Sequence, residues 1–174
     1  MRIALGFWGL TRSLKDHTIE SIKGNVFDVL SECGIEYDVF IHTYKKGDHD
    51  VSAECKLLSP VGCEIHNHDD VVPVIDFPKY RTHRDPWNGD YSAVDNFLLA
   101  MWSKSRLTKL IASSGVQYDR VVFIRPDCKY LTPLRPVFLA AAREGVVCIP
   151  DFDRFSQYKM NDRFAICTWK DFQA

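Results

Sequence analysis

A basic and an acidic side chain follow directly on one apolar run of the chain. The segment "YDRVVFIRPDCKYL" (118–131) contains the apolar residues 121–124 and then Arg125, Pro126 and Asp127. An aspartate can bind a hard cation such as Mg²⁺ or Mn²⁺, and an arginine presents a planar fork of donors to phosphate. The pattern therefore predicts a phosphate or metal site at the end of a buried strand. The competing interpretation is an ordinary strand end, because Pro126 cannot donate to a sheet and polar residues commonly follow at the turn.

A second candidate is the glycine-bearing turn "GFWGLTRSL" (6–14), which follows the first apolar run. Its glycines have neither the G-x-G-x-x-G spacing of dinucleotide-binding folds nor the spacing of the Walker P-loop. Phe7 and Trp8 could stack on a base or line its pocket, and Arg12 could engage phosphate. The alternative is a pair of core aromatics beside a surface arginine.

Three short acidic patterns compete for a divalent metal: "DHD" (48–50), "DFD" (151–153) and the single Asp127. A D-x-D pattern occurs by chance in any acidic loop, whereas Asp127 follows an apolar strand and faces the same edge as the glycine-bearing turn. The segment "HNHDD" would place His66 and His68 on one strand face with carboxylates behind them, which is a ligand set suited to a metal. Its neighbours do not form a firm strand pattern, so we expect a solvated loop there.

The elements that position these residues are predicted by alternating hydrophobic periods. Predicted strands are residues 2–8, 37–44, 119–124, 146–150 and 163–169, with one weak strand among the loops of 45–90; predicted helices are 16–33, 92–113 and a short one in "PVFLAAAREG". We therefore expect a single α/β domain over residues 1–174, a Rossmann-like sandwich with a mainly parallel central sheet flanked by helices. Such folds bind ligands beyond the carboxyl ends of their strands, where Gly9, Arg12, Arg125 and Asp127 are expected to lie.

Composition excludes several classes of function. The chain has 22 Lys and Arg residues and 23 Asp and Glu residues, which give a net charge of −1. The net charge therefore provides no general attraction to nucleic acid or to an anionic membrane. The apolar run in the N-terminal segment "MRIALGFWGLTRS" is too short for a signal peptide or a membrane span. Six cysteines without C-x-x-C spacing are expected to be reduced. We expect a cytoplasmic protein.

Several motifs in a fixed order resemble one family. The strand ending "GFWGLTRS", the strand "YDVFIHTY", the segment "YDRVVFIRPDCKYLTPL" and the segment "NDRFAI" are similar to GT-A-fold glycosyltransferases of the "RPD" type. The "HxDPW" pattern at 83–87 and "DNFLLAMWSK" at 95–104 resemble the glycosyltransferase domain encoded by chlorella viruses. The likeness extends over nearly the whole chain, and its joint order makes chance agreement improbable.

The resemblance implies a GT-A-like fold and a metal-dependent hexosyltransferase activity. A nucleotide-sugar donor, with UDP-sugar the first choice, would bind at the carboxyl edge of the sheet, with Mn²⁺ or Mg²⁺ between a protein carboxylate and the pyrophosphate, and a glycan or other hydroxyl would be the acceptor. The last aspartate of the family's metal motif corresponds to Asp127, while its first position is Arg125 here, which leaves one carboxylate fewer. The residues implied to bind the donor are Gly6, Phe7, Trp8, Gly9, Arg12, Asp95, Asn96 and Arg125.

Two further assignments depend on the resemblance. Asp162 lies in "NDRF", which borders the acceptor side in related enzymes, so we expect it to orient the acceptor hydroxyl or to act as general base. Asp95 and Asn96 lie in the first turns of a helix beginning near Tyr91, where side chains and backbone N–H groups can meet sugar hydroxyls or phosphate. The alternative for Asp162 is a turn residue, and for Asp95 a residue that only favours the helix start.

Family members continue beyond "NDRFAI", so the resemblance also implies that a chain ending at Ala174 is truncated. The alternative function is then a noncatalytic or truncated module that holds a nucleotide sugar without turning it over. A nucleotidyltransferase would also need a metal and a phosphate site, but it normally presents a glycine-rich basic loop that the sequence does not contain. A viral source would place the protein in the host cytoplasm.

Overall fold

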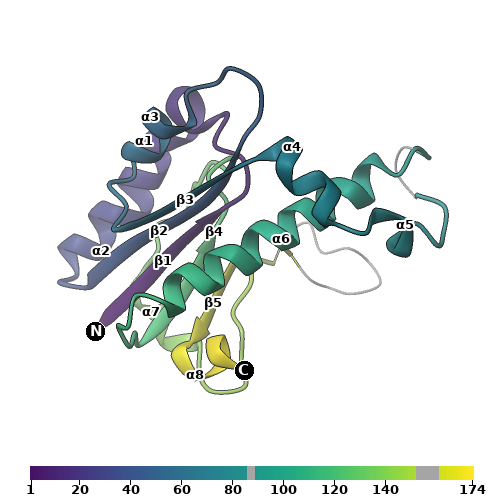
Figure 1. The fold of residues 1–174 in the computed structure, drawn as a ribbon. Helices are drawn as coiled ribbons and strands as arrows, with labels where there is room; N and C mark the ends of the chain where they lie inside the picture. Colours follow the sequence, from purple (N-terminus) through teal and green to yellow (C-terminus); the bar gives the residue numbers. More distant parts are fainter. Residues whose placement is uncertain (86–88, 152–160) are drawn as a thin grey trace.

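The computed structural model describes residues 1–85, 89–151 and 161–174, and the strands of these residues form one central sheet (Figure 1). The strands are β1 (Arg2–Trp8), β2 (Glu36–Lys45), β3 (Gly62–Asn67), β4 (Arg120–Ile124) and β5 (Phe164–Thr168), in the spatial order β3-β2-β1-β4-β5. The first four are parallel to one another, and β5 pairs antiparallel with β4. The expected α/β domain with a mainly parallel sheet flanked by helices is confirmed.

Alternation along β1 divides the hydrophobic core into two layers. Ile3, Leu5 and Phe7 point to one face of the sheet, while Ala4 and Trp8 point to the other. The first face is covered by the helical segment that runs through η1 (Leu14–Thr18), α1 (Ile19–Ile22), η2 (Lys23–Phe27) and α2 (Asp28–Glu32), together with α3 (Val51–Lys56) and α7 (Pro136–Ala141). Because successive side chains of a strand point to opposite faces, β1 contributes to the hydrophobic core on each face of the sheet.

The long helix α6 (Ser92–Ala112) crosses the other face of the sheet (Figure 1). Leu107 and Ile111 of α6 pack on β1 at Gly6. A Cβ added at Gly6 would lie 2.8 Å from Leu107 Cδ2 and 3.1 Å from Ile111 Cδ1. A side chain at position 6 would push the helix away from the sheet. Gly6 therefore permits the close approach that positions the polar side chains of α6 over the strand ends.

The order of the strands creates a topological switch point. The chain passes outward from β1 to β2 and β3, and then returns across the sheet through α6 to enter β4 on the other side of β1. The connections on the two sides of β1 cover opposite faces of the sheet, and open α/β sheets bind their ligands beyond the carboxyl ends of the strands at such a point. Trp8 ends β1 there, and Arg125 follows β4.

Three parts of the chain differ from the sequence-based expectations. The predicted helix at 16–33 is a continuous helical segment over residues 14–32 that contains two π-helical stretches, η1 and η2. The region 45–90 contains the expected single strand, but also the short helices α4 (His68–Val71), η3 (Val72–Val74) and α5 (Phe77–Tyr80) besides α3. The predicted strand at 146–150 is wrong, because this segment pairs with β5 at one isolated bridge, Cys148 with Ile166.

A last short helix, α8 (Trp169–Gln173), follows β5 directly, and Thr168 caps it by accepting a hydrogen bond from the backbone N–H of Asp171. Among residues 1–85, 89–151 and 161–174, none of the helices combines the length and the apolar character that crossing a bilayer requires.

Candidate functional site

The carboxyl ends of β1 and β4 bring an indole, a guanidinium and a carboxylate together. Trp8 is fully buried at the end of β1, and the chain turns away at Gly9, whose φ of +99° is a conformation that glycine adopts without strain. The Arg125 guanidinium lies over the Trp8 ring, with its Cζ 5.4 Å from the ring centroid. A cation over an indole face is attracted by the ring quadrupole, so Trp8 fixes where this positive charge lies.

Arg125 is also held by Asp127 through a two-pronged ion pair. Its Nε donates to Asp127 Oδ1 at 2.9 Å, and its Nη2 donates to Oδ2 at 2.6 Å. Tyr130 closes the turn, because its hydroxyl accepts from the Arg125 backbone N–H and donates to the Arg125 carbonyl. Bidentate pairs of this kind have a defined geometry. The arginine and the aspartate that the sequence placed after this strand therefore act as one rigid unit.

The antiparallel pairing of β5 with β4 delivers Asp162 to the same edge. The register pairs Ile124 with Phe164, and the Arg125 N–H donates to the Arg163 carbonyl at 3.2 Å, one step beyond the last ladder pair. Asp162 precedes Arg163 and so lies beside the turn at Pro126. Its negative charge favours the protonated forms of Arg125 and Lys104, although burial lowers the pKa of Lys104 overall. The structure therefore brings Asp127 and Asp162 to one edge of the sheet.

Lys104 is a further cation of this site that the sequence reasoning did not assign. It projects from α6, with Nζ 5.6 Å from the Trp8 ring centroid and 4.6 Å from the Phe123 ring centroid. Burial lowers the pKa of Lys104, an effect that the negative charge of Asp162 offsets only in part. Within the part of the chain that the structure describes, no carboxylate forms an ion pair with it. A desolvated lysine without a close counter-ion is poised to bind an anion.

Two buried polar atoms on either side of Gly9 lack partners among the described residues. They are the indole Nε1 of Trp8 and the hydroxyl Oγ1 of Thr11. Buried polar groups are normally hydrogen-bonded, and the exceptions concentrate where a ligand or an ordered water completes the structure. This adds a second mark of function to the edge at β1 and β4.

The structure separates several predicted donor-site residues from this cluster. Phe7 points into the opposite core and packs edge-to-face on Phe27 at 6.2 Å between ring centroids, so it does not line the edge. Arg12 is exposed beyond the turn. Asp95 is bound by the Arg81 guanidinium, with Nε to Oδ1 at 3.1 Å, and Asn96 is exposed beside it.

Asp95 lies nine residues before Lys104, or roughly 14 Å along the helix axis at 1.5 Å per residue. The segment "HRDPWNGDYSAVDN" (83–96) is also predicted to form one wall of the donor site, and it includes Trp87; the "DFD" pattern includes Asp153. Both residues lie outside the described part of the chain.

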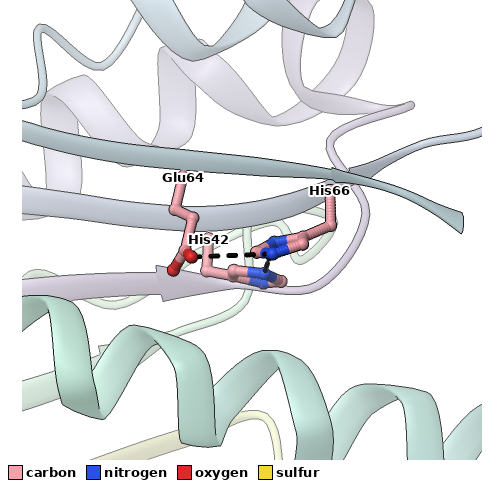
Figure 2. Close-up of side chains that lie close together, drawn as sticks. All are labelled: His42, Glu64 and His66. Atoms are coloured by element: carbon pink, nitrogen blue, oxygen red, sulfur yellow. Dashed lines mark hydrogen bonds and ion pairs between the residues drawn. The ribbon is translucent and has the colours of Figure 1, made fainter. Parts of the chain in front are cut away.

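A second polar cluster lies between the sheet and α6 (Figure 2). It consists of His42 on β2 and of Glu64 and His66 on β3, and the ligand atoms of the three side chains lie within 4.8 Å of one another. His42 Nε2 is 3.1 Å from His66 Nδ1, and His66 Nε2 is 3.6 Å from Glu64 Oε1. This group could hold a metal ion. The "HNHDD" segment, which was expected to be a solvated loop, instead places His66 on β3, while His68 begins α4 and pairs with Asp69.

Neighbours on α6 hold this histidine cluster in place. Ser103 Oγ lies 2.7 Å from His42 Nδ1, Arg106 forms an ion pair with Glu64, and the Trp102 ring packs edge-on to His66 at 4.9 Å. Burial lowers the pKa of His42 to about 4, so its imidazole is neutral at pH 7. Partial burial raises the pKa of Glu64, but the hydrogen bond and the charge of Arg106 outweigh burial and lower it overall.

A hollow at the opposite edge of the sheet lacks the unpaired charged groups that would bind a ligand. It has a volume of about 390 Å³ and lies at the amino ends of the parallel strands, where its polar lining includes Arg2, Asp38 and Tyr118. Asp38 accepts from Arg2 at 2.7 Å and from the Tyr118 hydroxyl at 2.8 Å. These groups satisfy one another, so the hollow presents no unpaired charge to a ligand.

Comparisons with known proteins add little to the site. No protein-family model matches the chain, and no curated protein matches it. Among solved structures, the crystal structure of mouse xyloside xylosyltransferase 1 in its apo form is similar over 99% of this chain and 69% of that chain, with a TM-score of 0.40 and 12% sequence identity. A similarity at this level is too low to argue from, so function has to be inferred from the residues themselves.

Proposed function

We propose that this chain is a glycosyltransferase domain that binds a nucleotide-sugar donor, a UDP-sugar in the first instance, beyond the carboxyl ends of β1 and β4. The observation that carries the proposal is the cluster of Trp8, Arg125, Asp127, Lys104 and Asp162 at the switch point. This is the position at which open α/β sheets bind ligands. The motif order of the glycosyltransferases of the "RPD" type supports the same conclusion from the sequence.

The two cations of the cluster suit a diphosphate. Arg125 and Lys104 both lie against the Trp8 ring, so two cationic groups lie near the carboxyl end of β1. When a sugar leaves a nucleoside diphosphate, negative charge grows on the pyrophosphate. Fixed positive groups aimed at that charge stabilise the transition state, because they need no reorganisation while the bond breaks. Arg125 and Lys104 have this role in the proposal.

Asp127 fits a single-carboxylate ligand for Mn²⁺ or Mg²⁺. A carboxylate has about four lone-pair positions, of which Arg125 occupies two, and the Asp127 side chain keeps 16% of its surface exposed. A hard cation of this kind needs only one or two protein carboxylates, with phosphate oxygens and water as its other ligands. The bound cation would supply Lewis acidity toward the pyrophosphate. Arg125, already paired with Asp127, would orient the carboxylate and add charge beside it.

Asp162 is the proposed general base. In glycosyl transfer the acceptor O–H adds to the anomeric carbon, the bond from that carbon to the diphosphate breaks with its electron pair, and the hydroxyl proton must leave. Asp162 lies at the same edge as Arg125 but on the neighbouring antiparallel strand end. It can therefore accept this proton or orient the hydroxyl while Asp127 serves the diphosphate. General bases typically contribute about 10²- to 10⁴-fold in rate.

Calorimetry with UDP and with UDP-sugars, each with and without Mn²⁺, tests the proposal. We expect saturable binding of UDP that Mn²⁺ tightens at least tenfold, and slow hydrolysis or transfer of the sugar. Binding without turnover, in the presence of simple glycan acceptors, would favour the alternative of a noncatalytic nucleotide-sugar-binding module. Failure to bind UDP under either condition would contradict the proposal.

A further inference from the structure

We propose that His42, Glu64 and His66 form a binding site for a divalent cation of the zinc class, separate from the donor site. The three side chains come from two adjacent strands and lie on the face covered by α6 (Figure 2). Two imidazoles and a carboxylate form the ligand set that Zn²⁺, Co²⁺ and Ni²⁺ prefer, whereas Mg²⁺ and Mn²⁺ prefer oxygen ligands alone. This inference goes beyond the proposed glycosyltransferase function and does not depend on it.

The parallel register of β2 and β3 builds the site. His42 pairs with Glu64, and Tyr44 pairs with His66, so each pair lies on the same face of the sheet. Since alternate residues of a strand share a face, His66 is the next residue after Glu64 on this side. Three donors are therefore placed by the backbone of a sheet rather than by a loop, and sheet elements hold ligands with little freedom.

The spacing of the two imidazoles suits a shared metal ion. A tetrahedral ion with Zn–N distances near 2.05 Å separates two ligand nitrogens by about 3.3 Å. His42 Nε2 and His66 Nδ1 are 3.1 Å apart, so an ion can replace the proton between them with a small movement. Glu64 and His66 retain 24% and 32% of their side-chain surface exposed. They can rotate toward an ion, and solvent reaches the site past them.

Ser103 fixes the tautomer of His42. Its single hydroxyl makes three contacts, because its Oγ accepts from the Gly9 N–H at 3.0 Å, lies 2.7 Å from His42 Nδ1 and lies 3.2 Å from the His42 carbonyl oxygen. All three are satisfied together when the hydroxyl donates to the carbonyl and Nδ1–H of His42 donates to the hydroxyl. That arrangement leaves Nε2 with a free lone pair toward His66, which is the form that binds a metal.

Arg106 orients Glu64 and also limits the affinity of the site. Its guanidinium engages both carboxylate oxygens of Glu64, with Nε 3.3 Å from Oε2. Hydrogen bonds from outside the ligand sphere hold a carboxylate ligand in place. The same positive charge opposes a divalent cation nearby. We therefore expect Zn²⁺ to bind the wild-type chain, and to bind more tightly when Met replaces Arg106.

Titration of the whole chain with Zn²⁺, followed by calorimetry, tests the inference. We expect one ion per chain, with at least tenfold weaker binding in His66→Ala and in Glu64→Gln, whose side chains are partly exposed and whose loss leaves the core intact. His17→Ala, which removes an exposed histidine on η1, is the matched control and should bind as the wild type does. Asp127→Asn should also retain the ion, because the two sites are separate.

The thiols of Cys55 and Cys63, which interact with each other, could bind zinc instead. The Cys63→Ser variant distinguishes a zinc site at the thiols from one at the histidine cluster. Unchanged Zn²⁺ affinity in this variant supports the histidine site, and loss of binding contradicts it. Co²⁺ gives a second readout, because thiolate ligands produce a charge-transfer band in the near ultraviolet that imidazole and carboxylate ligands do not. Wild-type affinity in both His66→Ala and Glu64→Gln, or an absence of Zn²⁺ binding to the wild type, would overturn the proposal.

Discussion

Arg125 is the residue through which the other groups of the donor site are connected. It lies over Trp8, binds Asp127 with two hydrogen bonds and acts electrostatically on Asp162 from one position at the end of β4. Three partners on three segments of the chain fix one guanidinium, so its charge is preorganised before a ligand arrives. An arginine at this position therefore places a fixed cation directly after β4.

Asp127 and Asp162 should have separable roles. Asp127→Asn keeps the shape of the side chain and removes its charge, so it should weaken Mn²⁺-dependent UDP binding at least tenfold. Asp162→Asn should leave UDP affinity within about threefold and lower the rate of sugar transfer by about 10²- to 10⁴-fold, because a general base acts in the chemical step. Calorimetry and product analysis measure the two quantities. Loss of UDP binding in Asp162→Asn with unchanged binding in Asp127→Asn would reverse the assignment.

Lys104 should reduce stability while it contributes to binding. Because burial lowers the pKa of Lys104 below its ordinary 10.5, the charged form is disfavoured in the folded state. Lys104→Met should therefore raise the melting temperature by about 2–4 °C for each kcal/mol recovered, and it should weaken UDP binding. The gain in stability is present below the folded-state pKa and should disappear as the pH rises through 10.5, where the lysine is neutral in both states.

Lys109 on the same helix supplies the control for this comparison. It is exposed, so Lys109→Met should change neither the melting temperature nor UDP affinity by a measurable amount. Thermal unfolding by circular dichroism and calorimetry give both values. A lower melting temperature in Lys104→Met, or unchanged UDP affinity, would show that Lys104 is an ordinary packed lysine.

Sequence patterns indicated those residues of the proposed donor site that follow a strand, whereas Asp162, which precedes β5, was indicated by the family resemblance alone. Trp8, Arg125 and Asp127 come directly at or after the ends of apolar runs, and parallel strands bring such ends together. Lys104 lies in the middle of a helix, and its contact with Trp8 depends on how α6 crosses the sheet, which no local pattern contains. Phe7 was predicted to line the site together with Trp8, but the alternation of side chains along β1 points it into the core on the opposite face.

At the scale of elements, α6 determines the geometry of both proposed sites. Lys104 reaches the donor edge, while the neighbouring Ser103 and the nearby Arg106 hold the histidine cluster. The periodicity of residues 92–113 predicted this helix well. The histidine cluster could have been found only from the register of β2 and β3, since His42 lies 22 positions before Glu64 in the chain. Short helices between residues 45 and 90 escaped prediction because they have too few turns for a period to appear.

Replacement of Gly6 should test the fit between β1 and α6. An added side chain meets Leu107 and Ile111, and overpacking of a core typically costs about 1–3 kcal/mol. Gly6→Val should therefore lower the melting temperature by several degrees, measured by circular dichroism. Gly24→Ala is the control, because nothing lies within 4 Å of its added Cβ in the helical segment on the other face, and it should be neutral or stabilising. Equal melting temperatures in Gly6→Val and the wild type would contradict the close contact.

For the whole molecule, the strand order explains why the residues of the proposed donor site lie at one edge of the sheet. Because β2 and β4 lie on either side of β1, the carboxyl ends of β1 and β4 are adjacent, and the antiparallel β5 brings Asp162 to the same edge. Alternating periods predicted this class of fold, since each strand and helix has its own local pattern. The strand predicted at 146–150 does not form, because this apolar run after the turn at Gly145 pairs with β5 at only one bridge. An apolar run therefore does not by itself show that a segment joins the sheet.

The indole N–H signals of the protein, observed by NMR, test the central claim most directly. Among the described residues, Trp8 lies at the donor edge, Trp102 beside the histidine cluster and Trp169 on α8 near the amino end of β4. Each signal can be assigned with a Trp→Phe variant. Addition of UDP and Mg²⁺, which unlike Mn²⁺ is diamagnetic and does not broaden the signals, should shift the Trp8 signal and leave Trp169 unchanged. Saturable UDP binding that leaves the Trp8 signal unchanged, or that shifts the Trp169 signal alone, would contradict a donor site beyond the carboxyl ends of β1 and β4.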